Sequence, residues 1–225
     1  IKYMFTLYHY YLCPSSRFIR IVLEEFKIKY NVQLENYWKP QKDFLKINPA
    51  GHLPVLINEE GFPIIGANAC LEYFQDLNLK PNLLGENYKD KAEIYRLYHW
   101  FDTLFKKEVL DPIIYEKVFS RVVDNITPNS SNIRAALQNL AFHINYLDYL
   151  LKQQDYLVTN SLTYLDFLAS ANLSVLDYLG LLNFEKNENI REWYSKLKSR
   201  PSFKTLLRDQ IVGLNPDEKY KLIDT

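Results

Sequence analysis

The sequence predicts a small α+β domain followed by an all-helical domain. Short segments with strand-like patterns end by residue 65, whereas helical spacing of apolar residues continues from residue 88 to residue 199. Between these regions, residues 78–85 are rich in turn-forming residues and read as a connection. We therefore expect a first domain at 1–79, a linker at 80–87 and a helical domain at 88–225, with a C-terminal tail from about 206.

In the first domain, strands and helices are predicted in an order that forms one sheet. Ser15 or Ser16 can cap the first helix, because a serine hydroxyl accepts a hydrogen bond from the first turn. Strands are predicted at 5–8, 30–34, 55–57 and 63–65, and helices at 15–26, 41–47 and 67–77. This order packs as a four-stranded sheet with helices on both faces.

In the second domain, only helical patterns recur. Helices are predicted at 88–119, 132–151 and 189–199, and Pro112 is expected to kink the first. The most apolar segment, 162–184, opens with Thr163 and Asp166 in capping-box spacing. Asp166 and Asp177 would each cost about 2.5–3.5 kcal/mol at a membrane centre. This segment is therefore predicted to be a buried core helix rather than a membrane span.

The composition argues against some classes of binding partner. Lys+Arg and Asp+Glu both number 27, so no overall charge favours nucleic acid or an anionic membrane. The two cysteines, Cys13 and Cys70, are too few for a disulfide scaffold and suit a reducing compartment. No signal-peptide pattern begins the sequence, so a cytoplasmic location is expected. The histidines lack a second ligand at metal spacing, so no metal site is expected.

The turn at 48–56 is the most informative motif. Pro54 stands at the entry to an apolar run, where it cannot donate to a strand ladder. A cis Leu53–Pro54 bond would suit a bend there and turn the Leu53 backbone outward, where an extended peptide can pair with it. The alternative is a surface turn in which Pro54 simply begins a buried strand.

The Asn-Pro-x-Gly-x-x-Pro-x-Leu turn, the Thr163–Asp166 capping box and the segment 191–203 together resemble the soluble glutathione transferase superfamily. The resemblance covers essentially the whole chain. It implies a thioredoxin-like first domain and the glutathione transferase fold. It also implies that the Leu53 backbone beside Pro54 binds the cysteinyl part of glutathione, and that His52 meets the glycyl carboxylate.

The same resemblance implies an activating thiol or hydroxyl at the start of the first helix, which here is Cys13 or Ser16. The pair Cys13-Pro14 resembles the thiol members of the superfamily, which form mixed disulfides. A helix N-terminus favours a thiolate. The alternative is that Cys13 is a small loop residue and the serines only cap the helix.

Gly66 and Ala67 depart from the superfamily's pattern. Most glutathione-binding members have an acid followed by Ser at this place, and both groups bind the γ-glutamyl end. Hydrogen bonds to charged groups contribute about 1.5–3 kcal/mol each, and about 1.4 kcal/mol is a tenfold change in affinity. Their loss predicts glutathione binding weakened by about a hundredfold, which Asn68 offsets only in part. No cofactor is therefore assured, and glutathione is the candidate ligand.

Residues 100–109, 115–118 and 200–224 resemble the FzlA family, bacterial proteins of transferase-like fold that bind filaments of the division protein FtsZ. The resemblance implies a cytoplasmic, homodimeric interaction protein that needs no catalysis. It implies partner contacts in the tail, for which the candidates are Arg208, Asp209, Tyr220 and Asp224. The tail would dock on a partner, fold back over the sheet, or do both. The alternative function is a glutathione-dependent transferase or thiol reductase that uses Cys13 or Ser16.

Overall fold

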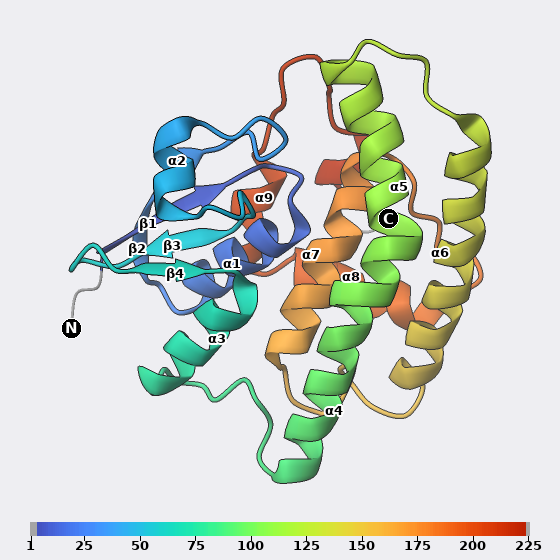
Figure 1. The fold of residues 1–225 in the computed structure, drawn as a ribbon. Helices are drawn as coiled ribbons and strands as arrows, with labels where there is room; N and C mark the ends of the chain where they lie inside the picture. Colours follow the sequence, from blue (N-terminus) through green and yellow to red (C-terminus); the bar gives the residue numbers. More distant parts are fainter. Residues whose placement is uncertain (1–3, 224–225) are drawn as a thin grey trace. The chain divides into compact units, whose positions relative to one another are not determined.

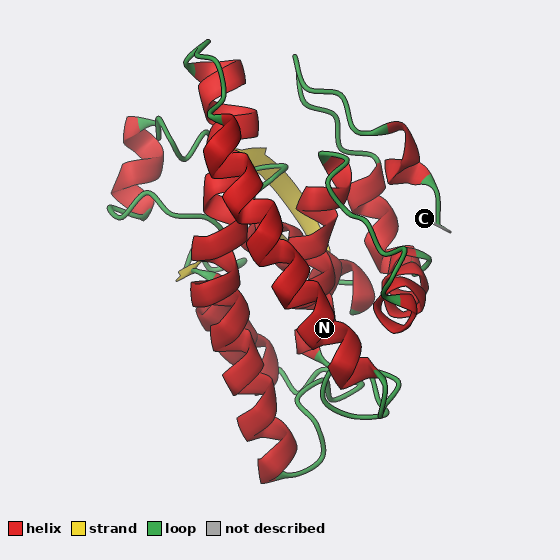
Figure 2. Cartoon of the chain, turned by 90° about the vertical axis from the view of Figure 1, so that its right-hand side faces the viewer, coloured by secondary structure: helices red, strands yellow, loops and turns green. Residues whose placement is uncertain are grey.

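The computed structural model describes residues 4–223, without the side chains of 121–123. The chain forms two compact units. One holds the residues up to Asn82 together with Arg200–Asp209, and the other holds Leu83–Ser199 and the residues from Gln210 onward. In the described part of the chain, named strands occur only in the first unit and helices dominate the second (Figures 1 and 2). The predicted fold class is confirmed.

The sheet-containing unit has its strands in the order β2-β1-β3-β4. β1 pairs with β2 in parallel and with β3 antiparallel, and β3 pairs with β4 antiparallel, so the sheet is mixed. Every predicted element is present, with ends within two residues of the prediction. The elements are β1 (Met4–His9), α1 (Pro14–Glu25), β2 (Lys29–Leu34), α2 (Lys42–Ile47), β3 (Val55–Ile57), β4 (Pro63–Ile65) and α3 (Ala67–Asp76).

Alternate side chains of β1 pack on different helices, because successive residues of a strand point to opposite faces. The ring of Phe5 lies 6.4 Å from that of Phe74 in α3, centroid to centroid. The ring of Tyr8 lies 5.4 Å from that of Phe44 in α2. Helices therefore cover both faces of the sheet, with α2 on one side and α1 and α3 on the other (Figure 1).

The segment Arg200–Asp209 belongs to the sheet unit, although the sequence placed it in the helical domain. It contains η3 (Pro201–Phe203) and α9 (Lys204–Leu207), which pack against α1. The physical reason is a buried ion pair: both terminal nitrogens of Arg20 donate to the Asp209 carboxylate, at 2.8 and 2.9 Å. Arg200 adds an ion pair to Glu25 at the end of α1.

The helical unit begins with one continuous helical stretch composed of α4 (Tyr88–His99), η1 (Trp100–Leu110), α5 (Asp111–Ile114) and η2 (Tyr115–Val123). Pro112 does not break it. It lies in the first turn of α5, between the π-helical segments η1 and η2. η1 and α5 lie beside α6 (Ser130–Leu151), as Figure 1 shows.

The core of the helical unit is α7 (Tyr164–Tyr178), in which every residue is buried. The predicted capping box is present: the Thr163 amide and hydroxyl donate to Asp166 Oδ2 at 2.9 and 2.7 Å. Asp166 Oδ1 also accepts from the Trp193 indole at 3.0 Å, so the buried carboxyl group is well hydrogen-bonded. Within residues 4–223, no helix is long and apolar enough to cross a membrane. The prediction of a core helix is confirmed.

The remaining helices close the helical unit. α8 (Glu188–Lys198) packs on α6 and α7, and η4 (Glu218–Lys221) packs on α7. The connection from α7 to α8 starts at Gly180, whose φ of +66° is a conformation that favours glycine. This glycine ends the apolar helix earlier than its hydropathy indicated.

Candidate functional site

The turn before β3 is built by Asn48 around a cis Leu53–Pro54 bond. The Asn48 side chain donates to the His52 carbonyl at 2.8 Å and accepts from the Ala50 amide at 3.2 Å. The chain bends at the cis bond, as the first reading of this turn predicted. Pro54 is also buried and β3 begins at the next residue, as the second reading predicted. His52 is exposed beside the turn.

The turn is tied to the start of α3 by the Gly66 amide, which donates to the Pro54 carbonyl at 2.9 Å. This hydrogen bond joins two of the candidate positions, Pro54 and Gly66. A ligand role for residues 53–54 and 66–68 stays a prediction.

Gly66 gives a physical reason for the missing acid. Its φ of +87° and ψ of 155° lie in a region that residues with a side chain rarely adopt. No acidic residue lies in the first turn of α3, and no side chain caps that helix. Ala67 offers only a buried methyl group, and Asn68 is exposed. The start of α3 therefore supplies a helix N-terminus and one amide side chain, without a carboxylate.

Cys13 lies at the start of α1 as its N-cap, and Pro14 follows in the first turn. Its Sγ is 4.0 Å from the Leu53 carbonyl oxygen, and 9% of the residue is exposed. The prediction that Ser15 or Ser16 caps α1 is wrong. Proline is favoured at the first helical position, so the helix begins before the serines.

Ser16 is fully buried, and its Oγ has no hydrogen-bond partner among the described residues. Both candidate activating groups are therefore buried, and only Cys13 keeps some exposure, at 9%. Cys70 is also buried, and burial raises the pKa of its thiol to about 12. Cys70 is for this reason an inert thiol.

A buried basic cluster under the sheet was not found by sequence reasoning. Burial, together with the charges of Arg20 and Arg17, lowers the pKa of His9 to about 3. Arg17 Nη1 lies 3.5 Å from Asp209 Oδ2 and donates to the Tyr11 carbonyl at 2.8 Å. The available signal was the pair of arginines three residues apart among the apolar residues in the middle of α1.

The four candidate partner residues of the tail have different environments. Arg208 is exposed, whereas Asp209 is only 4% exposed and is paired with Arg20. Tyr220 is fully buried, and Asp224 lies outside the described residues. The buried members hold the tail in place, so in this conformation they face the interior rather than a partner.

Tyr220 covers a second buried ion pair. Lys198 Nζ lies 2.7 Å from Asp177 Oδ2, although the ammonium is not aligned for a hydrogen bond. The Tyr220 ring centroid is 5.6 Å from that nitrogen, within cation–π range. The Tyr194 hydroxyl donates to the same Asp177 oxygen at 2.9 Å. The segment from Gln210 onward therefore folds back on the helical unit, not over the sheet that the prediction named.

Metal ligands do not gather in the described residues: within 4–223 no group of three or more His, Cys, Asp or Glu could hold a metal ion. The candidate site consists of the turn at cis-Pro54, the Cys13 thiol, and exposed His52 and Asn68.

Comparison with known proteins places this arrangement in a family. The models "Glutathione S-transferase, N-terminal domain" and "Glutathione S-transferase, C-terminal domain" match residues 12–77 and 114–210. FtsZ-localized protein A of Caulobacter vibrioides (strain NA1000 / CB15N) is 34% identical over 222 residues, which cover 97% of each chain.

Solved structures agree with this match. FzlA from C. crescentus superposes with a TM-score of 0.95 at 33% identity, covering 99% of this chain and 100% of that one. A glutathione S-transferase from Rhodospirillum rubrum F11 gives a TM-score of 0.94 at 36% identity with the same coverage. The chain belongs to the glutathione S-transferase superfamily and, within it, to the family of FtsZ-localized protein A.

Proposed function

We propose that this chain is a cytoplasmic, homodimeric protein that binds FtsZ filaments and does not depend on catalysis. The observation that carries the proposal is the 34% identity to FtsZ-localized protein A across 97% of both chains. The name of that relative associates it with FtsZ, and relatedness over the full length favours a shared partner.

The start of α3 supports a role other than glutathione turnover. The backbone conformation at Gly66 suits glycine, and glycine supplies no acid at the position where most glutathione-binding relatives have one. The charged end of glutathione would thus lack a counter-charge in α3.

The exposed residues of the C-terminal segment are the proposed partner contacts. Arg208 is exposed beside the anchored Asp209, and Val212 is 95% exposed at the tip of a turn closed by the Ile211–Leu214 bridge. Leu222 is also exposed, just after the buried Tyr220. Fixed neighbours hold these side chains toward solvent, which lowers the entropy lost on binding. Asp224 remains a proposed contact.

Co-sedimentation with FtsZ polymers tests the proposal. We expect the protein to pellet with polymers, and Arg208→Glu to reduce the pelleted fraction at least fivefold. Arg134→Glu, at an exposed position on α6, is the matched charge reversal and should pellet like the unaltered protein. No pelleting of the unaltered protein would contradict FtsZ binding, and equal pelleting of both variants would exclude Arg208 as a contact.

Point variants are better than truncation in this experiment. Deleting 206–225 would remove Asp209 and Tyr220, which leaves Arg20 without its buried counter-charge and uncovers the Lys198–Asp177 pair. A truncated chain that fails to pellet would not distinguish a lost contact from a lost fold.

The second candidate function is glutathione-dependent thiol chemistry, which the position of Cys13 favours. In a thiol reductase, the Cys13 thiolate would attack glutathione disulfide, forming a Cys13–glutathione disulfide and releasing one glutathione thiolate. Intact-protein mass spectrometry after incubation with glutathione disulfide tests this step. A single adduct that disappears in Cys13→Ala would support it, and an unmodified protein would exclude it.

A further inference from the structure

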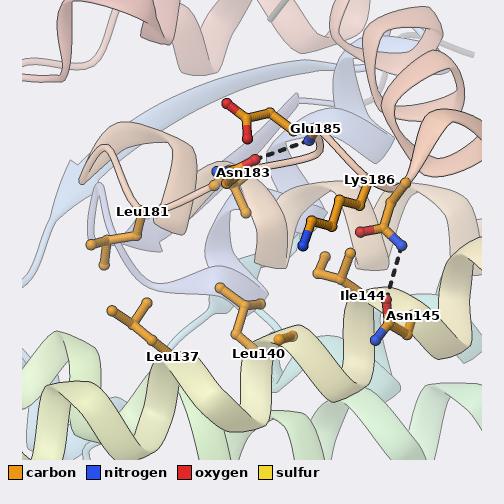
Figure 3. A pocket seen from close by; sticks show the side chains of 11 residues that line it. Leu137, Leu140, Ile144, Asn145, Leu181, Asn183, Glu185 and Lys186 are labelled. Carbon is orange, nitrogen blue, oxygen red and sulfur yellow. Dashed lines mark hydrogen bonds between the residues drawn. The ribbon is translucent and has the colours of Figure 1, made fainter.

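The helical unit contains a cavity of about 520 Å³ between α6 and the connection from α7 to α8 (Figure 3). All residues that line it belong to the helical unit, so it is no part of the site around Leu53 and Gly66. Its volume lies within the range of about 300–1,000 Å³ that is typical of small-molecule sites.

The floor of the cavity is an apolar stripe of α6. Leu137, Leu140 and Ile144 recur at helical spacing on one side of that helix, and Leu181 of the connection faces them across the opening (Figure 3). Leu137 and Leu181 are each partly exposed, so the stripe is only partly covered by protein. An elongated apolar group would remove this surface from water.

One end of the cavity carries a positive charge. Of the two charged residues that line it, Lys186 extends its amine toward Ile144, whereas the Glu185 carboxylate points away from the floor (Figure 3). No ion pair of Lys186 is present among residues 4–223. The cavity therefore combines an apolar floor with a cation that no carboxylate of the described chain neutralises.

Hydrogen bonds hold the polar end in shape. Asn187 Nδ2 donates to Asn145 Oδ1 at 3.0 Å, which links the connection to α6 beside the cavity. The Glu185 amide donates to Asn183 Oδ1 at 2.9 Å, which fixes the turn that carries Lys186. The lysine thus extends from a hydrogen-bonded loop over a helix, a partly preformed site rather than a mobile rim.

We propose that this cavity binds an aliphatic monocarboxylate of the fatty-acid class. The hydrocarbon chain would lie along the α6 stripe, and the carboxylate would pair with Lys186. The charge on Lys186 selects an anion, and the single cation selects one carboxylate over a di- or tricarboxylate. The apolar floor selects a chain over a small polar anion.

Isothermal titration calorimetry with dodecanoate and dodecanol tests both halves of the proposal. The full chain should bind dodecanoate saturably at one site. Lys186→Gln should weaken dodecanoate binding at least tenfold and leave dodecanol binding within twofold. Lys91→Gln, an exposed lysine on α4 outside the cavity, should bind both ligands like the unaltered protein.

A second variant fills the cavity from an exposed position. Ala141 lines the cavity and is exposed, so Ala141→Trp places an indole over the floor with little cost to the core. It should abolish binding of both ligands while the melting temperature stays within a few degrees. Absence of saturable dodecanoate binding to the unaltered protein would overturn the proposal. Unchanged binding of the ligands to Ala141→Trp would show that they bind elsewhere. Equal weakening of dodecanoate and dodecanol binding by Lys186→Gln would show that the charge of Lys186 does not bind the carboxylate.

Discussion

The start of α3 and the C-terminal segment use charge in opposite ways. At the start of α3, Gly66 and Ala67 offer no charged group, and the main chain is left to make contacts. In the C-terminal segment, Asp209 and Tyr220 are buried against charged side chains. The difference teaches that buried charges hold the C-terminal segment while the start of α3 has none, and the proposed partner contacts are the exposed neighbours of Asp209 and Tyr220.

The largest loss of stability is expected when Asp209 is substituted. Asp209→Ala leaves the buried Arg20 without a counter-charge, which costs about 3–5 kcal/mol of unfolding free energy. Urea denaturation measures this cost. Asp43→Ala removes an exposed pair with Lys46 and should leave the midpoint nearly unchanged. Equal urea midpoints for the two variants would contradict the claim that the buried ion pair stabilises the protein more than the exposed one.

The second-largest loss of stability is expected when Tyr220 is substituted. Tyr220→Ala removes a fully buried ring from Lys198 and from Tyr178, whose ring centroid is 5.2 Å away. A buried aromatic truncated to alanine costs about 3 kcal/mol or more. Leu222→Ala, two residues on and exposed, should cost little. A thermal melt of Tyr220→Ala that overlays the unaltered protein would show that the tail is not anchored there.

His9 makes the stability of the fold depend on pH. In the folded state the pKa of His9 is lowered to about 3 by burial and by Arg20 and Arg17, against 6.5 for an ordinary histidine. The unfolded chain therefore binds the extra proton first as pH falls. This group's contribution is present above pH 6.5 and declines by up to about 1.4 kcal/mol per pH unit below it.

The measurement for His9 is unfolding free energy between pH 7 and pH 5. His9→Gln should flatten the slope relative to the unaltered protein, whereas His52→Gln, at an exposed position, should not. If His9→Gln keeps the full slope, another group is responsible for the acid sensitivity.

The smallest effect concerns the two cysteines. Cys13 keeps 9% exposure, whereas Cys70 is fully buried and burial raises the pKa of its thiol to about 12. A disulfide reagent should therefore label one thiol per chain in the folded protein and two after denaturation. Cys13→Ala should abolish the labelling of the folded form. Labelling of both thiols in the folded state would contradict the buried environment of Cys70.

Local sequence patterns were enough to predict most of the fold. The period of apolar residues placed the strands and helices of the first 77 residues and the long helices of the second domain. Thr163 with Asp166 marked the start of α7 because capping is a contact over three residues. The short helices after residue 200 were not predicted. The Arg20–Asp209 pair joins residues 189 positions apart, and no local pattern signals it. The assignment of Asp209 to a partner surface, and of residues 200–209 to the helical domain, depended on that missing contact.

The candidate site was predictable in part for the same reason. The turn at Pro54 and the loss of side chains at Gly66 are visible in the sequence, whereas the backbone conformation of Gly66 is not. Ser16 was chosen by its residue type, and Pro14 shifted the helix start so that the hydroxyl became buried. Residue types in the sequence located the candidate site, whereas the backbone geometry determined which side chains are exposed there.

Isothermal titration calorimetry with glutathione tests the central claim that this cleft lacks the charges to hold that tripeptide. We expect no saturable binding up to about 1 mM, an affinity of about 4 kcal/mol or less. Ala67→Ser, which restores a hydroxyl where the backbone allows it, should change this little because the acid at position 66 is still missing. Saturable binding of glutathione to the unaltered protein in the micromolar range would contradict the account.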